Sequence, residues 1–428
     1  MRTHMKTLSA ALFLVAGAAG VASGNAFNIN EHDAKVTGRG GASVASNTDA
    51  SSVIFNPGGI PVAEGTQVSV GGSLYIAKGS YEPPGEERIK TTSPPTPVPN
   101  LFVTSRVHDL VAVGFGVHFP FGLSISWPLT HPQADAITSQ TLRTYFLTPA
   151  VGINLNKYVP GLSIGGGVDI VPATVELRRS IFFGDVAGEA HLGGDAVGFG
   201  GRAGIQYRPE ALPQLRAGLM WRSKVDLDFE GEADFDIAQP FRDQLPPDGD
   251  ISTSITLPQS ISGGVAYNPI RDLQVELNVV WINWNVFDEL NIQLPGGAES
   301  ITIEDYENTI TWRVGAEYAL PKYKAAVRAG FIYDPTPIPD TAQTAQLPDV
   351  NRKNVTLGGS YYFGDYSANL GLLWVTPGNR DTSDELYMPV FKANYGVQAF
   401  VTSLSITGTF GAGAAKTPAP DPTQTASR

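Results

Sequence analysis

The stretch TQVSVGGSLYIA, residues 66–77, places valine, leucine and isoleucine at every second position, with polar or small residues between them. An extended strand turns successive side chains to opposite faces, so this pattern gives one apolar face and one polar face. Near-neutral mean hydropathy continues along the whole chain. Both features fit either soluble β-domains or a barrel whose apolar face meets lipid.

The same alternation returns along the chain, and each repeat ends in turn-forming residues. Fourteen strand segments are predicted, at residues 66–77, 98–107, 110–127, 142–155, 162–183, 190–207, 215–235, 251–267, 273–292, 309–320, 325–335, 352–363, 367–375 and 391–410. Short turns alternate with longer loops, such as residues 236–250 and 334–349, which are rich in Pro, Asp and Glu. Bacterial barrels place short turns in the periplasm and long loops outside. The sequence therefore predicts an all-β fold, a 14-stranded antiparallel transmembrane β-barrel.

Composition narrows the function classes. The 428 residues carry a formal net charge of −12, so a nucleic-acid partner is not expected. The absence of Cys excludes disulfides, thiolate metal sites and cysteine nucleophiles. The scattered histidines show no metal-ligand spacing, so we expect no metal, no cofactor and no enzyme activity.

The chain divides into four predicted parts. Residues 1–26 read as a cleaved signal peptide, with Arg2 and Lys6 before an apolar core and small residues before a cut after Gly24 or Ala26. Residues 27–64 are rich in small residues and are expected to form a plug, or hatch, in the barrel lumen rather than a solvated linker. Residues 65–410 form the barrel, and residues 411–428 read as a disordered tail. A signal peptide followed by a barrel predicts the outer membrane of a Gram-negative cell.

Several short motifs carry a family likeness in their order and spacing. They are FNINE at 27–31, Gly38-Arg39, Asp49-Ala50, Asn56-Pro57-Gly58, Trp284 with Phe287, and DPTPIP at 334–339. Together the chain resembles the FadL family of outer-membrane long-chain fatty acid transporters, which also includes aromatic-hydrocarbon channels. The resemblance implies that extracellular loops capture a hydrophobic ligand, that the hatch rearranges, and that the ligand leaves sideways through the barrel wall.

The resemblance also implies site residues. Substrate binding falls on Arg179, Phe27 and Ile29, the hatch gate on Asn56, Pro57 and Gly58, and a kink for lateral opening on Phe119, Pro120, Phe121 and Gly122. Each has a structural alternative. Arg179 could face solvent or lipopolysaccharide phosphate, Asn56-Pro57-Gly58 could simply end the hatch, and Pro120 could mark a strand end or bulge.

One position departs from the family pattern. Glu304 stands near a family lysine, which favours a neutral hydrophobic ligand over a carboxylate. The expected partners are that ligand, outer-membrane lipids and lipopolysaccharide, and the barrel-assembly machinery, with the protein as a monomer. The alternative functions are a general porin and a surface receptor or adhesin barrel.

Overall fold

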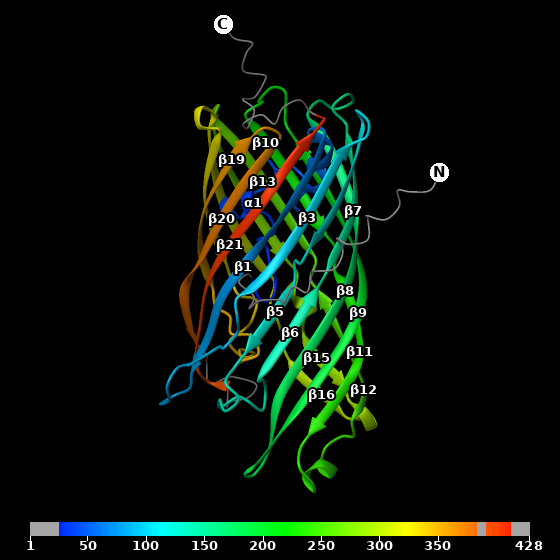
Figure 1. The fold of residues 1–428 in the computed structure, drawn as a ribbon, viewed down its shortest axis with the longest axis vertical. Coiled ribbons are helices and arrows are strands. Elements are labelled where there is room, and N and C mark those ends of the chain that lie inside the picture. Colours follow the sequence, from blue (N-terminus) through cyan, green and yellow to red (C-terminus); the bar gives the residue numbers. More distant parts are fainter. Residues whose placement is uncertain (1–24, 383–390, 412–428) are drawn as a thin grey trace, which may run out of the picture.

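In a computed structural model, which describes residues 25–382 and 391–411, the chain forms one antiparallel sheet that closes on itself (Figure 1). The predicted signal peptide up to residue 24 and the predicted tail beyond residue 411 lie outside the described residues. The strands are β1 (Thr66–Glu82), β2 (Ile89–Lys90), β3 (Thr96–Arg106), β4 (Val111–His118), β5 (Gly122–Ser126), β6 (Ser139–Thr144), β7 (Phe146–Asn154), β8 (Leu162–Phe183), β9 (Val186–Tyr207), β10 (Leu215–Arg222), β11 (Val225–Asp236), β12 (Gly249–Leu257), β13 (Ser260–Ile270), β14 (Leu273–Ile282), β15 (Glu289–Gln293), β16 (Glu299–Ile303), β17 (Thr309–Leu320), β18 (Ala325–Asp334), β19 (Arg352–Phe363), β20 (Tyr366–Asp381) and β21 (Asn394–Phe410).

The sheet is a closed barrel because its first and last strands pair. β1 pairs with β21 from Thr66↔Phe410 to Glu82↔Asn394. Seven of the fourteen wall strands are interrupted, as β2/β3, β4/β5, β6/β7, β10/β11, β12/β13, β14/β15 and β16/β17. The prediction of a 14-stranded antiparallel barrel is confirmed, and the interruptions are what the alternation pattern did not reveal.

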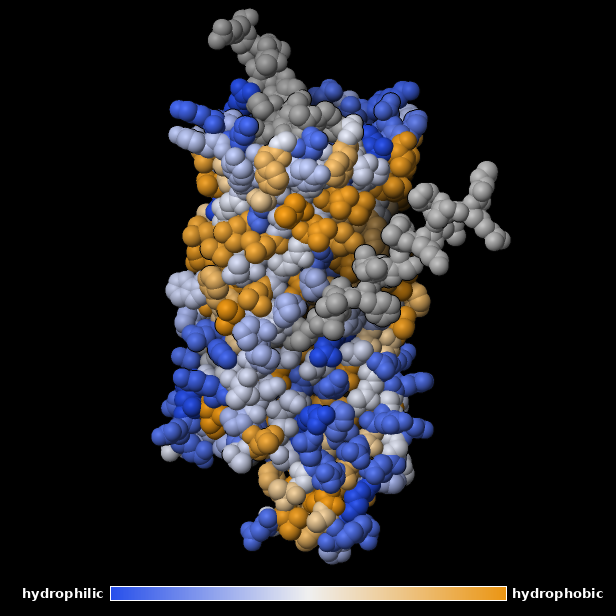
Figure 2. All heavy atoms as spheres, in the orientation of Figure 1, coloured by the Kyte–Doolittle hydropathy of each residue, from blue (hydrophilic) through white to orange (hydrophobic). Residues whose placement is uncertain are grey.

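The wall is polar on its inner face and apolar on its outer face, which is the reverse of a soluble barrel. On β1, Ser69 and Ser73 are buried in the lumen, whereas Val70 is 56% exposed on the outer face. Figure 2 shows a belt of hydrophobic residues across the upper half of the visible face, with hydrophilic residues above it and below it. An apolar outer belt around a polar interior is what a lipid bilayer requires of a spanning barrel. Among the described residues, no helix is long and apolar enough to cross a membrane.

The segment from Asn25 to Ala63 lies within the barrel. It contains two short helices, α1 (Ala34–Gly38) and α2 (Ser52–Phe55), and the 3₁₀ helix η1 (Pro57–Val62). The helix α1 packs against β18 to β21, and η1 packs against β7, β8 and β9 across the lumen. Further 3₁₀ turns are η2 (Phe241–Gln244), η3 (Trp284–Val286), η4 (Pro295–Gly297) and η5 (Pro321–Tyr323). We call residues 25–63 the hatch segment.

Glycines on the inner wall allow the hatch segment to approach the strands closely. A Cβ atom at Gly371 would lie 2.4 Å from the carbonyl oxygen of Ala34, and one at Gly165 would lie 2.2 Å from that of Pro57. Gly218 and Gly315 face the hatch backbone in the same way. Any side chain at these positions would collide with the hatch, which gives a packing reason for part of the high glycine content.

Candidate functional site

An apolar cavity occupies the half of the barrel that carries β5, β6, β12 and β15 (Figure 1). Its volume is about 970 Å³, counting the space at its open mouth, which falls in the range of small-molecule sites. Leu142, Val175, Phe229 and Ile255 contribute from the wall, and Phe27 contributes from the hatch segment. The loop between β18 and β19 folds over the cavity and adds Ile338, Ala342 and Leu347. Ligand capture by the extracellular loops was predicted, but none of the predicted site residues lies in this loop, although its DPTPIP motif is part of the family likeness.

Aromatic rings form the end of the cavity nearest the hatch segment. The Phe27 ring lies 4.9 Å from Trp284 and 5.5 Å from Phe287, both edge-on, and 6.0 Å from Phe121. Tyr306 contacts Phe287 at 5.0 Å between ring centroids. Edge-on aromatic contacts of this kind stabilise a defined wall. Phe27 is thus the hatch residue that an occupant of the cavity would touch.

Glu304 is one of three carboxylates, with Glu176 and Glu230, among the residues that line the cavity, and it is the buried one. No Lys, Arg or His is among the residues that line the cavity. Burial raises the pKa of Glu304 to about 8, and the hydrogen bond with Tyr306 offsets only part of that increase. Glu304 is therefore uncharged at neutral pH, and this cavity offers no cation to a carboxylate ligand.

Arg179 lies beyond the cavity rather than in its wall. It is not among the lining residues, but Leu177, two residues earlier on β8, is. Because side chains two apart share a face of a strand, Arg179 points to the same side as Leu177, one step nearer the long loops. It is half-buried and attracted to Asp135 in the loop between β5 and β6. Its neighbour Arg178 forms an ion pair with Glu189 at 2.6 Å on the exposed face.

The predicted gate residues Asn56, Pro57 and Gly58 lie in the part of the hatch that is fixed to the wall. The Asn56 amide donates to the carbonyl of Ile205 at 3.0 Å, and its side-chain oxygen accepts from the Gly58 amide at 2.9 Å. The Ser163 hydroxyl donates to the Gly58 carbonyl at 2.7 Å. None of the three predicted gate residues lines the apolar cavity. This end of the hatch is anchored to β8 and β9.

The predicted kink interrupts the third wall strand. β3 and β4 pair as far as Leu101↔Val117, and β5 then pairs with β6 but, among the described strands, not with β3. The two sides meet again where the Thr92 amide donates to the Ser126 carbonyl at 2.8 Å. The wall therefore has a gap in its hydrogen bonding, which we call the window. Phe119 and Ile29 pack with Val98 of β3 in one apolar cluster there.

The β3 edge of the window contains two prolines. β3 keeps its ladder to β1 through Pro97 and Pro99, which pair with Leu74 and Gly72. Proline cannot donate, so the alternate residues, such as Val98, must supply the amide hydrogens of that ladder. The amides of residues 97 and 99 would face the window, and neither has a hydrogen. The edge therefore has no unpaired donor at these two positions.

The start of the hatch segment bonds to the backbone of the kink. The Ile29 amide donates to the Pro120 carbonyl at 2.8 Å, and the Gly122 amide donates to the Phe27 carbonyl at 2.9 Å. Asn28 and Phe121 form an antiparallel bridge between these two bonds. Phe27, Asn28 and Ile29 thus touch the cavity, the kink and the window cluster in turn.

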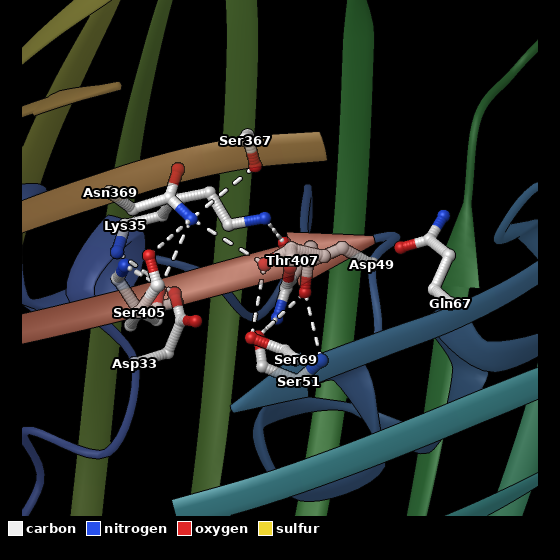
Figure 3. A network of polar contacts seen from close by, with 12 residues as sticks. Asp33, Lys35, Asp49, Ser51, Gln67, Ser69, Ser367, Asn369, Ser405 and Thr407 are labelled. Carbon is white, nitrogen blue, oxygen red and sulfur yellow. Dashed lines mark hydrogen bonds and ion pairs between the residues drawn. The ribbon is translucent and has the colours of Figure 1, made fainter. Parts of the chain in front are cut away.

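A network of ionic and polar contacts holds the hatch helices in the other half of the barrel (Figure 3). Lys35 forms an ion pair with Asp49, so the two hatch helices are linked. Although burial alone would raise the pKa of Asp49, the ammonium of Lys35 lowers it to about 2. The Asp33 carboxylate caps α1 by accepting from the amides of Lys35 and Val36. This part of the hatch is pinned more tightly than its first residues.

Two enzyme-like readings find no support. The stretch GLSIG at residues 161–165 has the spacing of a nucleophile elbow, but Ser163 lies in the β8 ladder with its hydroxyl on the Gly58 carbonyl. An elbow requires a turn from strand to helix. Within residues 25–382 and 391–411, no three His, Asp or Glu side chains gather as metal ligands would.

Comparison with known proteins agrees with this architecture. The family model described as outer membrane protein transport protein (OMPP1/FadL/TodX) matches residues 15–410. Outer membrane protein P1 of Haemophilus influenzae is 24% identical, with 87% of this chain and 90% of that protein covered. The long-chain fatty acid transport protein of Salmonella typhi is 26% identical, with 82% and 87% covered.

Solved structures share the fold at low sequence identity. A FadL homologue from Pseudomonas aeruginosa superimposes with a TM-score of 0.77 at 18% identity, covering 90% of this chain and all of that one. The toluene transporter TodX of Pseudomonas putida gives 0.69 at 20% identity, covering 91% and 99%. These structures are similar in fold.

Proposed function

This chain belongs to the OMPP1/FadL/TodX family of outer-membrane transport proteins, and on that premise we propose that it moves hydrophobic compounds into the cell through a window in its own wall. The family consists of transport channels rather than enzymes, and its members reside in the Gram-negative outer membrane. Relatives are named for long-chain fatty acids and for toluene. We infer that cargo of this hydrophobic class occupies the apolar cavity.

Cargo enters from the exterior at the mouth of the cavity. The loop between β18 and β19 brings Ile338 and Leu347 to the cavity, so apolar surface begins at the loops. Arg179, one step outward from Leu177 on β8, would attract the carboxylate of an acidic cargo on its way in. Burial of the hydrocarbon part then supplies the favourable free energy, at about 25 cal/mol per Å² of apolar surface.

A straight path through the barrel is closed to such cargo. The half nearer the short turns contains the hatch helices and a polar vestibule of about 1650 Å³, lined by charged residues that include Arg39, Arg216 and Glu317. A hydrophobic compound gains nothing by moving from an apolar cavity into a polar one. This occupied, polar half also counts against a general porin. Sideways exit into the membrane leaves the compound in an apolar medium throughout.

The observation that carries the proposal is the position of Phe27, Asn28 and Ile29. Phe27 lines the cavity, Asn28 bridges the kink, and Ile29 packs in the window cluster. Cargo that displaces the Phe27 ring would pull on the two backbone bonds to Pro120 and Gly122 and loosen the cluster that fills the window. The prolines of β3 would leave few unpaired donors for lipid to face, which lowers the cost of opening.

The anchored residues Asn56, Pro57 and Gly58 would act as the fixed end of the hatch, so that movement is confined to its first residues.

Asn25 donates to Thr309 at 2.8 Å inside the barrel, which favours signal cleavage after Gly24 over cleavage after Ala26. Assembly by the barrel-assembly machinery, contact with lipopolysaccharide and a monomeric state stay predictions.

A disulfide lock tests the route directly, because the natural chain has no Cys. Asn28→Cys with Phe121→Cys places two thiols on a bridged antiparallel pair, a spacing that a disulfide can span. We expect the oxidised protein to bind a fluorescent fatty acid but not to deliver it in cells, and reduction to restore uptake. The control pair, Thr66→Cys with Phe410→Cys, crosslinks the wall away from the window and should leave uptake unchanged. Full uptake by the oxidised Asn28/Phe121 pair would rule out this route.

A further inference from the structure

A second, smaller cavity lies between the hatch segment and the kink. Its volume is about 580 Å³, and Asn28 and Pro120 both line it. The two cavities have no lining residue in common, and Phe27, which lines the apolar cavity, directly precedes Asn28 in the hatch segment. We call the smaller cavity the basic pocket, because its lining includes Arg202, Arg222, Arg313, His32 and His118 but no Asp or Glu.

One of the three arginines is neutralised. Arg202 forms a buried ion pair with Asp169 at 2.8 Å and donates to the Ile54 carbonyl at 3.1 Å. Asp169 lies in the wall behind Arg202 and does not line the pocket. This ion pair balances the charge of Arg202 but not the charges of Arg222 and Arg313.

Arg222 and Arg313 lack such partners. In the part of the chain that the structure describes, neither guanidinium forms an ion pair or a hydrogen bond, and the Nε atom of each is buried without a partner. Arg313 is 7% exposed, and only longer-range attraction to Asp334 and Glu31 acts on it. Arg222 lies 4.7 Å above the Phe121 ring. Burying a charge without a counter-charge is costly, so these two side chains leave room for an anion.

A histidine adds a third donor. The guanidinium of Arg202 donates to Nε2 of His118 at 3.1 Å, and since arginine only donates, Nε2 must be the unprotonated nitrogen. The hydrogen of the neutral ring is then on Nδ1, which is buried without a partner in a side chain that is 1% exposed. His32 is different, because its Nε2 lies 2.9 Å from the Ile29 carbonyl and must donate to it. His32 therefore presents no free donor.

We propose that the basic pocket binds the carboxylate of an amphiphilic cargo, with Arg222, Arg313 and the Nδ1 hydrogen of His118 as donors. The inference rests on the transport function proposed above and places the head group of an acidic cargo in this pocket. Planar guanidinium groups suit a carboxylate, which accepts on both oxygens. The apolar cavity has carboxylates but no Lys, Arg or His among its lining residues, and most of that lining is apolar, so it suits the hydrocarbon tail while the head lies past Phe27, next to the kink.

Binding of matched twelve-carbon ligands tests the assignment. Dodecanoate and 1-dodecanol share a tail and differ in the charge of the head. Measured by calorimetry on the full-length protein in a non-ionic detergent at neutral pH, dodecanoate is expected to bind about tenfold more tightly. Arg222→Gln and Arg313→Gln should each remove most of that advantage and leave 1-dodecanol unaffected, whereas Arg222→Lys should retain part of it. Equal affinity of wild type for the two ligands would overturn the proposal.

Controls separate the sources of failure. Arg216→Gln changes a partly buried arginine of the polar vestibule and should change neither affinity. Heat-modifiable migration on gels shows that each variant is folded. If acetate binds as tightly as dodecanoate, the pocket takes any small anion and the cargo assignment is wrong. If neither twelve-carbon ligand binds to wild type, the proposed transport function itself fails.

Discussion

At the scale of single residues, the face of the strand on which a side chain lies decides whether it can contact cargo. Leu177 lines the apolar cavity and Arg178 lies on the outer face in an ion pair. Position along the strand and position around the lumen together decide which residues meet cargo. The alternation in the sequence predicts the position of a residue along its strand, but its position around the lumen is known only from the folded barrel.

Arg179 and Arg178 give a matched pair for testing capture. Arg179→Ala is expected to slow association of a fatty acid severalfold, because the inward face then lacks a cation near the mouth. The equilibrium affinity should change little, since the cation is not in the cavity. Stopped-flow fluorescence with a labelled fatty acid measures the rate. Arg178→Ala, on the outer face, should have no effect, and equal effects of the two substitutions would argue against a role for Arg179.

Glu304 should make stability depend on pH. Its pKa is near 4.5 when the chain is unfolded and about 8 when it is folded, so between these values the folded state holds more protons. The contribution of protonated Glu304 to the stability of the folded state is therefore fully present below pH 4.5 and is lost as the pH rises to about 8. The melting temperature of wild type relative to Glu304→Gln should fall by a few degrees across this range. A constant difference in melting temperature would show that Glu304 is ionised in the folded protein.

At the scale of elements, the barrel strands were predictable and the breaks in them were not. Alternation located all fourteen segments because a wall between water and lipid imposes a period of two. It read residues 110–127 as one strand with a weak point at Pro120, whereas the wall has two strands with a window beside the second. The interruption at Ser223 had no such signal, and Pro258, which marks the one at Gln259, was not interpreted as a break. Both interruptions depend on partners across the lumen, which no local pattern records.

The functional site was predictable only in part, for the same reason. Phe27 and Pro120 were identified from family motifs, and the structure places the first in the cavity wall and the second beside the basic pocket. Arg222 and Arg313 belong to strands far apart in the sequence, and no pattern along the chain predicts that they share a pocket. Their shared pocket and their missing counter-charges become visible only once the barrel is closed.

Restoring a backbone donor at the kink should hinder exit. Pro120→Val is expected to reduce uptake severalfold without affecting assembly, because a strand-forming residue favours continuous pairing where the window lies. Uptake of a radiolabelled fatty acid by cells measures this. Pro149→Val is the control, since Pro149 lies in β7 opposite Phe115, away from the window. Normal uptake with Pro120→Val would argue against exit through the window.

At the scale of the whole molecule, the hatch segment decides whether the barrel is a pore. A fourteen-stranded barrel is wider than one that side chains can fill. Deletion of residues 27–64 should leave a folded, heat-modifiable barrel with a large conductance in planar bilayers. Intact protein should show only rare openings. An equally low conductance after deletion would mean that the loops, and not the hatch, close the lumen.

The interlocking of hatch backbone with wall glycines also constrains how the protein is made. The carbonyl of Ala34 lies against Gly371 near the end of the chain, and that of Pro57 lies against Gly165 in its first half. We expect β1 and β21 to pair last, around a hatch segment that already lies against the wall, because both contacts can then form without threading the hatch through a closed barrel. In this order of assembly the barrel closes around the hatch segment, and the hatch segment is not inserted into a closed barrel.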